Sequence, residues 1–279
     1  MISAEQLSKR FGDTIAVNKV SFRVPQGDTM VLLGPSGCGK TTTLRMINKL
    51  VEPDSGQLFI DGMEVTNRQP EVLRRSIGYV LQHHGLFPHY TVSENIAIVP
   101  KLLKWSRQKI QQRGEELFIK LNLDPSLKNQ YPAALSGGQQ QRVGLARALM
   151  ADPPVLLMDE PFGALDNLTR IRIRKEFMEL DELRRKTVVM VTHDIQEAFE
   201  MGDQICLMDK GTVMQLGTPE QLLFQPANAF VEDFLKDQRL PLELKALKIG
   251  QQSAWEVMDG LKRTDLQQVL SRAINNPGN

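Results

Sequence analysis

Residues 34–41 constrain the fold more than any other stretch of this sequence. They read GPSGCGKT and match the phosphate-loop pattern GxxxxGK[ST]. The apolar run TMVLLG precedes them, and TTTLRMINKL, which has helical periodicity, follows. In such a loop the glycines let backbone N–H groups close around phosphates, Lys40 supplies a positive charge, and the Thr41 hydroxyl can ligate Mg²⁺. The order strand, glycine-rich loop, helix therefore predicts a nucleotide-binding domain.

Strand-like and helix-like segments alternate along most of the chain. PVLLMDE and TVVMVTHD are continuous apolar runs, typical of strands that are buried on both faces. GQLFIDGMEVT and QICLMDKGTVMQLG are expected to form hairpins that turn at residues 61–62 and 210–211. This alternation predicts an α/β core with an antiparallel β subdomain.

The pattern becomes helical at about residues 84–150, where Pro100, Pro125 and Pro132 are expected to break the helices. We therefore expect one domain over 1–236 that contains this α-helical subdomain. A short helical tail is expected over 237–279 and should dock on its own core or on a partner protomer.

Composition and charge limit the classes of function. The chain has 279 residues, of which 41% are hydrophobic, and a net charge of +1, so bulk charge predicts neither nucleic acid nor an anionic membrane as a partner. No apolar run approaches the roughly 20 residues that span a bilayer, and the N-terminus has no signal-peptide pattern. Two distant cysteines predict no disulfide framework and fit a reducing compartment.

A basic run at 170–176, RIRIRKE, lies within the helical segment LTRIRIRKEFMELDELRRK. Leu168, Ile171, Phe177 and Leu180 give this segment one apolar stripe, which we expect to face the core. The basic side chains are then expected on a solvated helix face, not in a nucleic-acid site.

The strand VLLMDE ends in two adjacent acids, Asp159 and Glu160. Such a pair usually begins a solvated loop, but the phosphate loop gives it a second interpretation. Asp159 could hold the water shell of Mg²⁺. Glu160, which should point the other way, could face an attacking water molecule.

Four further stretches follow one order along the chain. These are Gln82 at the end of the expected strand SIGYVLQ, LSGGQ at 135–139, GALD at 163–166, and His193 after VVMVT. With the phosphate loop and the acidic pair, they make the chain resemble the nucleotide-binding subunit of ATP-binding-cassette (ABC) transporters over roughly residues 3–236. The resemblance implies an ATP hydrolase with the α/β fold of phosphate-loop NTPases.

The resemblance also implies a role for each matching position. Glu160 is the implied catalytic carboxylate, with Gln82 and His193 beside it, and Phe11 is the implied adenine-stacking ring. The implied Mg²⁺ ligands are Thr41, Gln82 and Asp159. The implied nucleotide contacts are Phe11, Gly34, Pro35, Ser36, Gly37, Cys38, Gly39, Lys40, Thr41, Thr42, Ser136, Gly137, Gly138, Gln139 and Asp166.

LSGGQ itself would make a phosphate site, since glycines at a helix start expose backbone N–H groups, yet it lacks a lysine. The resemblance explains this by a head-to-tail dimer of two ATPase subunits. Ser136 and Gly138 of one chain would face the γ-phosphate that Lys40 of the other chain holds. Asp166 would couple the two protomers, and hydrolysis would let the dimer open.

The resemblance further implies membrane partners. Transmembrane permease subunits would be contacted through about residues 82–95, a substrate-binding protein would act indirectly, and the chain would lie peripherally on the cytoplasmic face of the plasma membrane. Residues 82–105 look like the same segment of importer ATPases for glycine betaine, carnitine and choline. Polyamine, sulfate or molybdate importers, an exporter, or a soluble ABC ATPase are the alternatives.

One departure from that subfamily is visible. Many of its ATPases continue into paired cystathionine-β-synthase (CBS) repeats, and the 43 residues after residue 236 are too few for that pair. We therefore expect the repeats to be lacking here.

Two groups of side chains permit a further interpretation. His83, His84 and His89 could bind a metal, but no carboxylate or cysteine joins them at a recognised spacing, so we favour a contact surface or a solvated loop.

Cys38 is expected to be a small filler of the phosphate loop. The alternative is a thiolate, stabilised by the helix start, that makes the enzyme sensitive to oxidants.

Overall fold

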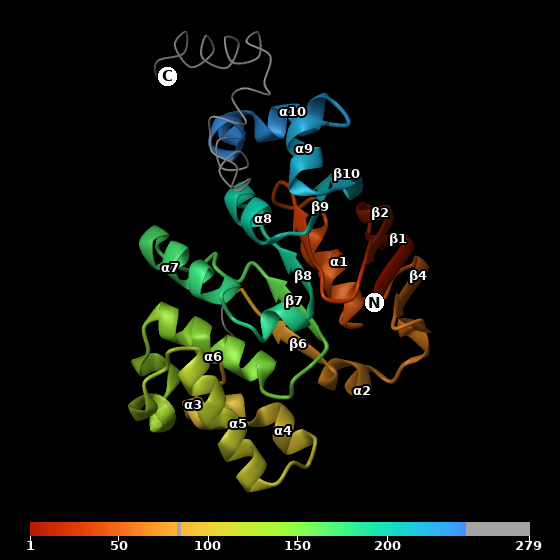
Figure 1. Ribbon diagram of the computed structural model, residues 1–279. Helices are drawn as coiled ribbons and strands as arrows, with labels where there is room; N and C mark the ends of the chain where they lie inside the picture. The colour runs from red at the N-terminus through yellow and green to blue at the C-terminus, as the bar shows by residue number, and fades with distance from the viewer. Residues whose placement is uncertain (83–84, 244–279) are drawn as a thin grey trace.

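The computed structural model describes residues 1–82 and 85–243, which form two sheets and a group of helices (Figure 1). A four-stranded antiparallel sheet has the order β2-β1-β4-β5. Its strands are β1 (Ile2–Phe11), β2 (Thr14–Val24), β4 (Ser55–Ile60) and β5 (Met63–Glu64). The turn between β4 and β5 is the one that the sequence predicts, and both of its residues, Asp61 and Gly62, have positive φ.

The central sheet has six strands in the order β10-β9-β3-β8-β7-β6, and only the β9–β10 pair is antiparallel. Its strands are β3 (Thr29–Leu33), β6 (Ile77–Val80), β7 (Val155–Asp159), β8 (Thr187–Val191), β9 (Gln204–Asp209) and β10 (Thr212–Gly217). The predicted hairpin at residues 210–211 is thus confirmed.

The continuous apolar strands are buried on both faces, as their sequences predict. Met30 and Leu32 of β3 join a core with the antiparallel sheet and α1 (Lys40–Ile47), whereas Val31 and Leu33 join a second core with helices of the opposite face. Alternate side chains of one strand therefore hold two layers to the central sheet.

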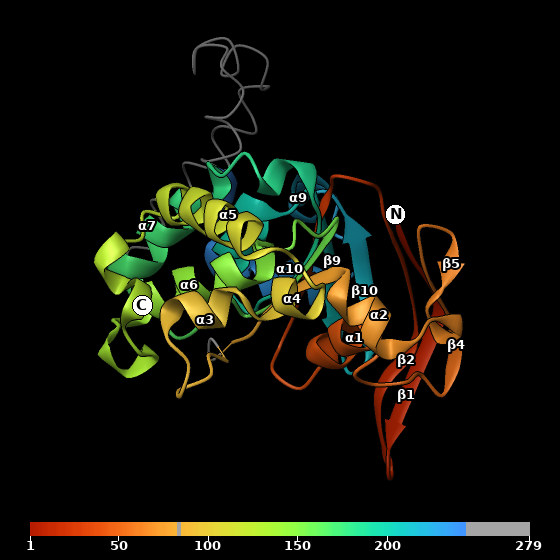
Figure 2. The same ribbon diagram turned by 90° about the horizontal axis from the view of Figure 1, so that it is seen from below.

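The helical subdomain lies between β6 and β7 in sequence. It gathers at the end of the molecule remote from the antiparallel sheet, as both views show (Figures 1 and 2). Its helices are α3 (Val92–Ile96), α4 (Ile98–Leu102), α5 (Arg107–Lys120) and α6 (Gly137–Leu149). The remaining helices are α2 (Pro70–Arg75), α7 (Asn167–Met178), α8 (Ile195–Met201), α9 (Pro219–Phe224) and α10 (Ala229–Leu235).

The prediction that Pro100 breaks a helix is wrong. Pro100 lies within the first turn of α4, and the chain is interrupted at Ala97 instead. A first-turn residue needs no N–H because that group would have no partner inside the helix, so proline is tolerated there. Pro125 and Pro132 each begin a short 3₁₀ turn, which is consistent with the expected breaks.

The helix predicted after the acidic pair is shorter than its periodicity suggests. α7 ends at Met178, and the buried Leu183 begins a separate 3₁₀ turn. The predicted single stripe is also wrong for two of its members, since Leu168 and Ile171 are 82% and 57% exposed. Phe177 does face the core, and so does Ile173.

In the part of the chain that the structure describes, no helix combines the length and the apolar character needed to cross a membrane. The tail predicted over 237–279, with Trp255 and Met258, lies almost wholly outside the described residues.

Candidate active site

The carboxyl ends of four parallel strands carry the candidate residues. The phosphate loop follows β3, Gln82 follows β6, Glu160 follows β7 and His193 follows β8. Because the carboxyl ends of parallel strands meet at one edge of a sheet, residues far apart in sequence come together there.

Two glycines of the phosphate loop are required by close backbone contacts. Gly34 and Gly39 have φ of 145° and 103°, a region that favours glycine. A Cβ atom on Gly34 would lie 2.1 Å from the Met208 carbonyl oxygen, and one on Gly39 would lie 2.2 Å from the Ala16 carbonyl oxygen. The loop is thus wedged between β9 and β2, and this packing sets its curvature.

Lys40 begins α1 and bends its side chain back into the loop. Its Nζ donates to the carbonyl oxygens of Gly34 and Pro35 at 2.7 and 2.8 Å, and the residue is only 5% exposed. The ammonium group therefore lies inside the curve of the loop, where it can exchange these neutral carbonyl acceptors for anionic ones.

Asp159 and Thr41 meet at the base of the loop. Thr41 Oγ1 donates to Asp159 Oδ1 at 2.9 Å, and an Arg45 nitrogen lies 3.9 Å from Asp159 Oδ2. Burial raises the pKa of Asp159, although the Thr41 hydrogen bond and the Arg45 charge oppose that shift. A hydroxyl and a carboxylate side by side are hard oxygen ligands, which fit Mg²⁺.

Tyr79 completes this corner and was missed in the sequence. Its hydroxyl is buried and makes no ordinary hydrogen bond within the described chain. Burial, followed by the charge of Asp159, raises the pKa of Tyr79 to about 12. The predicted strand SIGYVLQ does not by itself indicate that Tyr79 lies near Asp159, because only the pairing of β6 with β7 brings the two residues close together.

Glu160 points away from Asp159 toward a separate pair of side chains. Gln82 Nε2 donates to Glu160 Oε2 at 2.9 Å, and His193 Nδ1 lies 3.3 Å from the same oxygen. Glu160 has a φ of 45°, which is uncommon for a residue with a side chain and turns the carboxylate out of the strand direction. The structure thus brings these candidate residues together at one oxygen atom.

The backbone on both sides of His193 is held by a buried acid that the sequence analysis missed. Thr192 Oγ1 donates to Glu197 Oε2 at 2.6 Å, and the Asp194 N–H donates to Thr192 Oγ1 at 3.0 Å. Asp194 also caps α8 by accepting from the Glu197 N–H at 3.1 Å. Burial raises the pKa of Glu197. The spacing D-x-x-E, which resembles a capping box, was the available signal.

The LSGGQ loop forms a tightly capped helix start. Ser136 Oγ accepts from the Gln139 N–H at 3.3 Å, and Gln139 Oε1 accepts from the Ser136 N–H at 2.9 Å. A Cβ on Gly138 would lie 3.1 Å from Ile173 Cδ1, so α6 and α7 approach closely here and the end of the Ile173 side chain would have to shift to admit one. Gly137 and Gly138 lie at the first positions of α6, whose N–H groups have no partner within the helix.

Ser136 and Asp166 open on one hollow of about 700 Å³ between the start of α6 and the start of α7. Asp166 caps α7 by accepting from the Thr169 N–H at 3.0 Å, and that hydrogen bond lowers its pKa. Among the described residues that line this hollow, none comes from 34–41. The phosphate loop and the LSGGQ loop therefore do not share this cavity within one chain.

Phe11 is 51% exposed near the tip of the β1–β2 hairpin. Its hairpin partner strand β2 contributes Ala16, whose carbonyl oxygen lies against Gly39. The ring is thus presented by the same hairpin that touches the phosphate loop, with Lys9 Nζ 5.6 Å from its centroid.

A buried asparagine organises the loop after Gln82. Asn95 Nδ2 donates to the carbonyl oxygens of Phe87, Tyr90 and Thr91 at 3.0 to 3.1 Å, and its Oδ1 accepts from the Phe87 N–H at 2.8 Å. The rings of Phe87, His89 and Tyr90 lie 4.6 to 6.0 Å apart. We call these three side chains the aromatic cluster. His83 and His84, from the same candidate group, lie outside the described residues.

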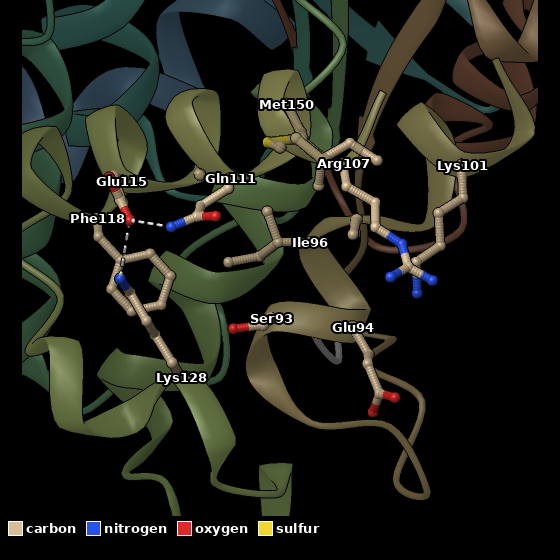
Figure 3. A pocket seen from close by; sticks show the side chains of 13 residues that line it. Ser93, Glu94, Ile96, Lys101, Arg107, Gln111, Glu115, Phe118, Lys128 and Met150 are labelled. Carbon is tan, nitrogen blue, oxygen red and sulfur yellow. Dashed lines mark hydrogen bonds and ion pairs between the residues drawn. The ribbon is translucent and has the colours of Figure 1, made fainter. Parts of the chain in front are cut away.

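An apolar pocket of about 360 Å³ adjoins this loop between α3, α4 and α5 (Figure 3). Ile96, Phe118 and Met150 are among its lining residues. Charged side chains stand at its rim, with Lys101 and Arg107 at one side and the Glu115–Lys128 pair, 3.7 Å apart, at the other.

Cys38 is 3% exposed, and burial raises the pKa of its thiol in spite of the nearby Lys40 charge. The raised pKa argues against the thiolate alternative, because it leaves less thiolate at neutral pH.

Comparison with known protein families gives a match over residues 17–163 to the model described as "ABC transporter". The chain is 49% identical over 241 residues to the glycine betaine/carnitine/choline transport ATP-binding protein OpuCA of Bacillus subtilis (strain 168), which covers 86% of this chain and 63% of OpuCA. It is also 49% identical over 248 residues to the glycine betaine uptake system ATP-binding protein YehX of Escherichia coli (strain K12), which covers 89% and 80%. The chain thus spans less than two thirds of the length of OpuCA.

Among solved structures, the chain is similar to the dimeric structure of a post-hydrolysis state of the ATP-binding cassette MJ0796 bound to ADP and Pi. The TM-score is 0.70 at 34% identity, and the match covers 78% of this chain and 99% of that chain. The two-sheet architecture with a helical subdomain, predicted from the sequence, is therefore confirmed.

Proposed function

The chain belongs to the ABC transporter family, and from that premise we propose that it binds and hydrolyses ATP to power a membrane importer. The observation that carries this proposal is the convergence of Lys40, Asp159, Glu160 and His193 at the carboxyl ends of β3, β7 and β8. The proposed ATPase domain comprises residues 1–236, with the helical subdomain at about 84–150, followed by the tail at 237–279.

The phosphate loop binds the triphosphate through the backbone N–H groups of residues 34–41. Lys40 exchanges its two carbonyl acceptors for phosphate oxygens, a stronger charge-assisted interaction. Thr41 and Asp159, which already touch, would hold Mg²⁺, with Gln82 as a further ligand. When bound, that ion offsets negative charge on the phosphates. The exposed ring of Phe11 stacks on the adenine.

Glu160 is the residue that orients the attacking water and accepts its proton. Gln82 and His193 hold one of its carboxylate oxygens, which limits the carboxylate to a narrow range of orientations. Because the carboxylate is already oriented, it needs little rearrangement to accept the proton in the transition state. His193 is 57% exposed at its side chain, so it can also reach the terminal phosphate.

Two chains are needed for one complete site. Ser136, Gly138 and Asp166 open on a cavity that no residue of 34–41 lines, so the Ser136 hydroxyl and the Gly138 N–H are available to the nucleotide of a second ATPase subunit. The similar cassette structure is dimeric and holds ADP and Pi, which supports this arrangement.

The aromatic cluster and the neighbouring pocket form the proposed permease contact. Phe87 and Tyr90 are 44% and 39% exposed, and Ser93 and Glu94 of the adjoining helix line the pocket. An exposed apolar surface beside charged side chains is typical of a protein interface. Gln82, which precedes this loop, would transmit the contact to Glu160. A substrate-binding protein would act through the permease, at the cytoplasmic face of the membrane.

The proposed cargo is a quaternary ammonium osmoprotectant. The printed names of two relatives at 49% identity, OpuCA and YehX, include glycine betaine, and OpuCA adds carnitine and choline. Cargo does not touch this subunit, so the proposal depends on those relatives and on the segment at 82–105.

Uptake by the reconstituted complex tests the whole proposal. The chain is combined in liposomes with candidate permease and substrate-binding proteins, and uptake of labelled glycine betaine, carnitine and choline is compared with that of sulfate and a polyamine. ATP-dependent uptake of the quaternary ammonium solutes supports the proposal. Uptake of sulfate or polyamine alone contradicts the proposed cargo, and ATP hydrolysis by the assembled complex without uptake of any of these solutes contradicts the importer function.

A further inference from the structure

Helix α7 presents apolar side chains on two faces. Ile173 and Phe177 point into the core, where Phe177 meets Phe162 edge to face with centroids 5.6 Å apart. Ile171 and Met178 lie on another face and remain 57% and 36% exposed. Their separation of seven residues puts them on one side of the helix. The core does not account for this second apolar face.

The second face forms one wall of a groove. Ile171 and Met178 of α7, Phe199 of α8, and Pro219 and Leu223 of α9 line a hollow of about 470 Å³. Its volume falls within the range of about 300 to 1,000 Å³ that is typical of ligand pockets, so it can hold several apolar groups. Its lining also includes the exposed Lys175 and Glu220 and the largely buried Arg174–Glu200 ion pair, whose atoms are 2.6 Å apart.

The described chain ends at this groove. After α10 the backbone passes α8, where Gln196 Nε2 donates to Gln238 Oε1 at 3.1 Å. Arg239 then pairs with Glu243 at 2.8 Å, and Leu242 is 5% exposed and lines the groove itself. One apolar residue of the C-terminal segment is therefore already part of the groove wall.

The next residues of the chain have the chemistry that the groove requires. The first large apolar residues beyond the described range are Leu244, Leu247 and Ile249, with Lys245 and Lys248 between them. Leu247 is five residues beyond Leu242, a reach of at most about 18 Å in an extended chain. The exposed carboxylate of Glu220 suits the intervening lysines. An intramolecular segment this close also has a high effective concentration at the groove.

We propose that the C-terminal segment of 244–279 folds back on its own chain and packs Leu244, Leu247 and Ile249 into the groove between α7, α8 and α9. The segment covers Ile171 and Met178, which explains why α7 carries a second apolar face. It lies against two helices that begin directly after Asp166 and Asp194 and are joined there by Arg170, 3.7 Å from Asp194.

Cross-linking in the full chain tests the proposal without reference to ATP hydrolysis. Met178→Cys combined with Leu247→Cys is treated with a short bismaleimide, and cross-linked peptides are identified by mass spectrometry. The native thiols Cys38 and Cys206 are buried, at 3% and 0% exposure, so they react slowly. We expect a cross-link within one chain whose yield is independent of protein concentration.

The matched control joins Leu247→Cys to Ile119→Cys, an exposed residue (78%) on α5 of the helical subdomain. A yield for the Met178 pair no higher than for this control overturns the proposal. A cross-link that forms only between two chains also overturns it, because the occupant would then be a second copy.

Accessibility gives a second test. Ile171→Cys is labelled with a maleimide in the full chain and in a chain that ends at Glu243. Loss of the covering segment should raise the labelling rate by about fivefold or more, since a packed side chain reacts only when its cover opens. Equal rates in two folded chains overturn the proposal, and a truncated chain that does not fold leaves the cross-linking test decisive.

Discussion

The side-chain amide of Gln82 donates a 2.9 Å hydrogen bond to Glu160 Oε2, and this contact joins the ends of β6 and β7 across 78 residues of sequence. His193 Nδ1 lies 3.3 Å from the same oxygen. A glutamine next to the proposed permease contact therefore touches the proposed catalytic carboxylate directly. Any displacement of the loop after Gln82 would reach that carboxylate through one hydrogen bond.

Glu160→Gln should leave ATP binding intact and lower turnover by at least about 100-fold, because an amide cannot accept the proton of the attacking water. The unhydrolysed ATP should then hold two chains together. Binding is measured by fluorescence titration, turnover by phosphate release, and the dimer by size-exclusion chromatography. Glu179→Gln, a change of the same type at the exposed end of α7, is the control. Turnover near that of the wild type would refute the assignment of Glu160.

Ser136→Arg should reduce turnover by about 100-fold while ATP binding to the isolated chain persists. The arginine fills the cavity that Ser136 shares with Asp166 and blocks the approach of a second nucleotide site. Ser126→Arg, on an exposed serine of the same subdomain, should change neither quantity. Loss of ATP binding by the monomeric Ser136 variant would show that this serine acts within its own chain.

Gly39→Ala should destabilise the nucleotide-free protein by about 2–5 kcal/mol, because the added Cβ meets the Ala16 carbonyl oxygen at 2.2 Å and φ is positive. Gly37→Ala is the matched control. Its φ of 78° is also positive, but no atom lies within 4 Å of the new Cβ, so only about 1–2 kcal/mol should be lost. Urea unfolding gives both values. Equal losses would mean that loop contact with β2 does not contribute.

Glu182→Gln should lower the free energy of unfolding at pH 7 by about 1–3 kcal/mol. Glu182 accepts from Arg113 at 2.7 and 2.8 Å and from Lys120 at 2.5 Å, and it thereby ties α5 to the turn after α7. Asp181→Asn, in an exposed pair with Arg184 at 3.9 Å, is the control and should change stability by less than about 0.5 kcal/mol.

The same contact predicts a dependence on pH. Burial tends to raise the pKa of Glu182, but its hydrogen bonds to Arg113 and Lys120 outweigh burial and lower that pKa below its ordinary value of 4.5. The contribution of a carboxylate with a lowered pKa is complete above the unfolded value and is lost as the pH falls through the folded one. The stability difference between wild type and Glu182→Gln should therefore shrink as the pH falls below 4.5. A constant difference down to pH 3 would contradict an ionic role.

The phosphate loop and the positions of several strands along the chain could be predicted from the sequence because they depend on local chemistry. The spacing in residues 34–41 requires glycines and one lysine, and the continuous apolar runs of β7 and β8 indicate burial on both faces. The turns at residues 61–62 and 210–211 likewise follow from residues that tolerate positive φ.

Tertiary structure decided the features that join residues from separate elements. The orientation of Glu160 depends on its own φ and on contacts with Gln82 and His193. The hydrogen bonds of Asn95 to the backbone of Phe87, Tyr90 and Thr91 follow from how the loop closes over α3. Helical periodicity alone predicted one apolar face on the helix after the acidic pair. It could not separate the face that meets the core from the face that meets the groove, because periodicity does not specify which neighbours surround a helix.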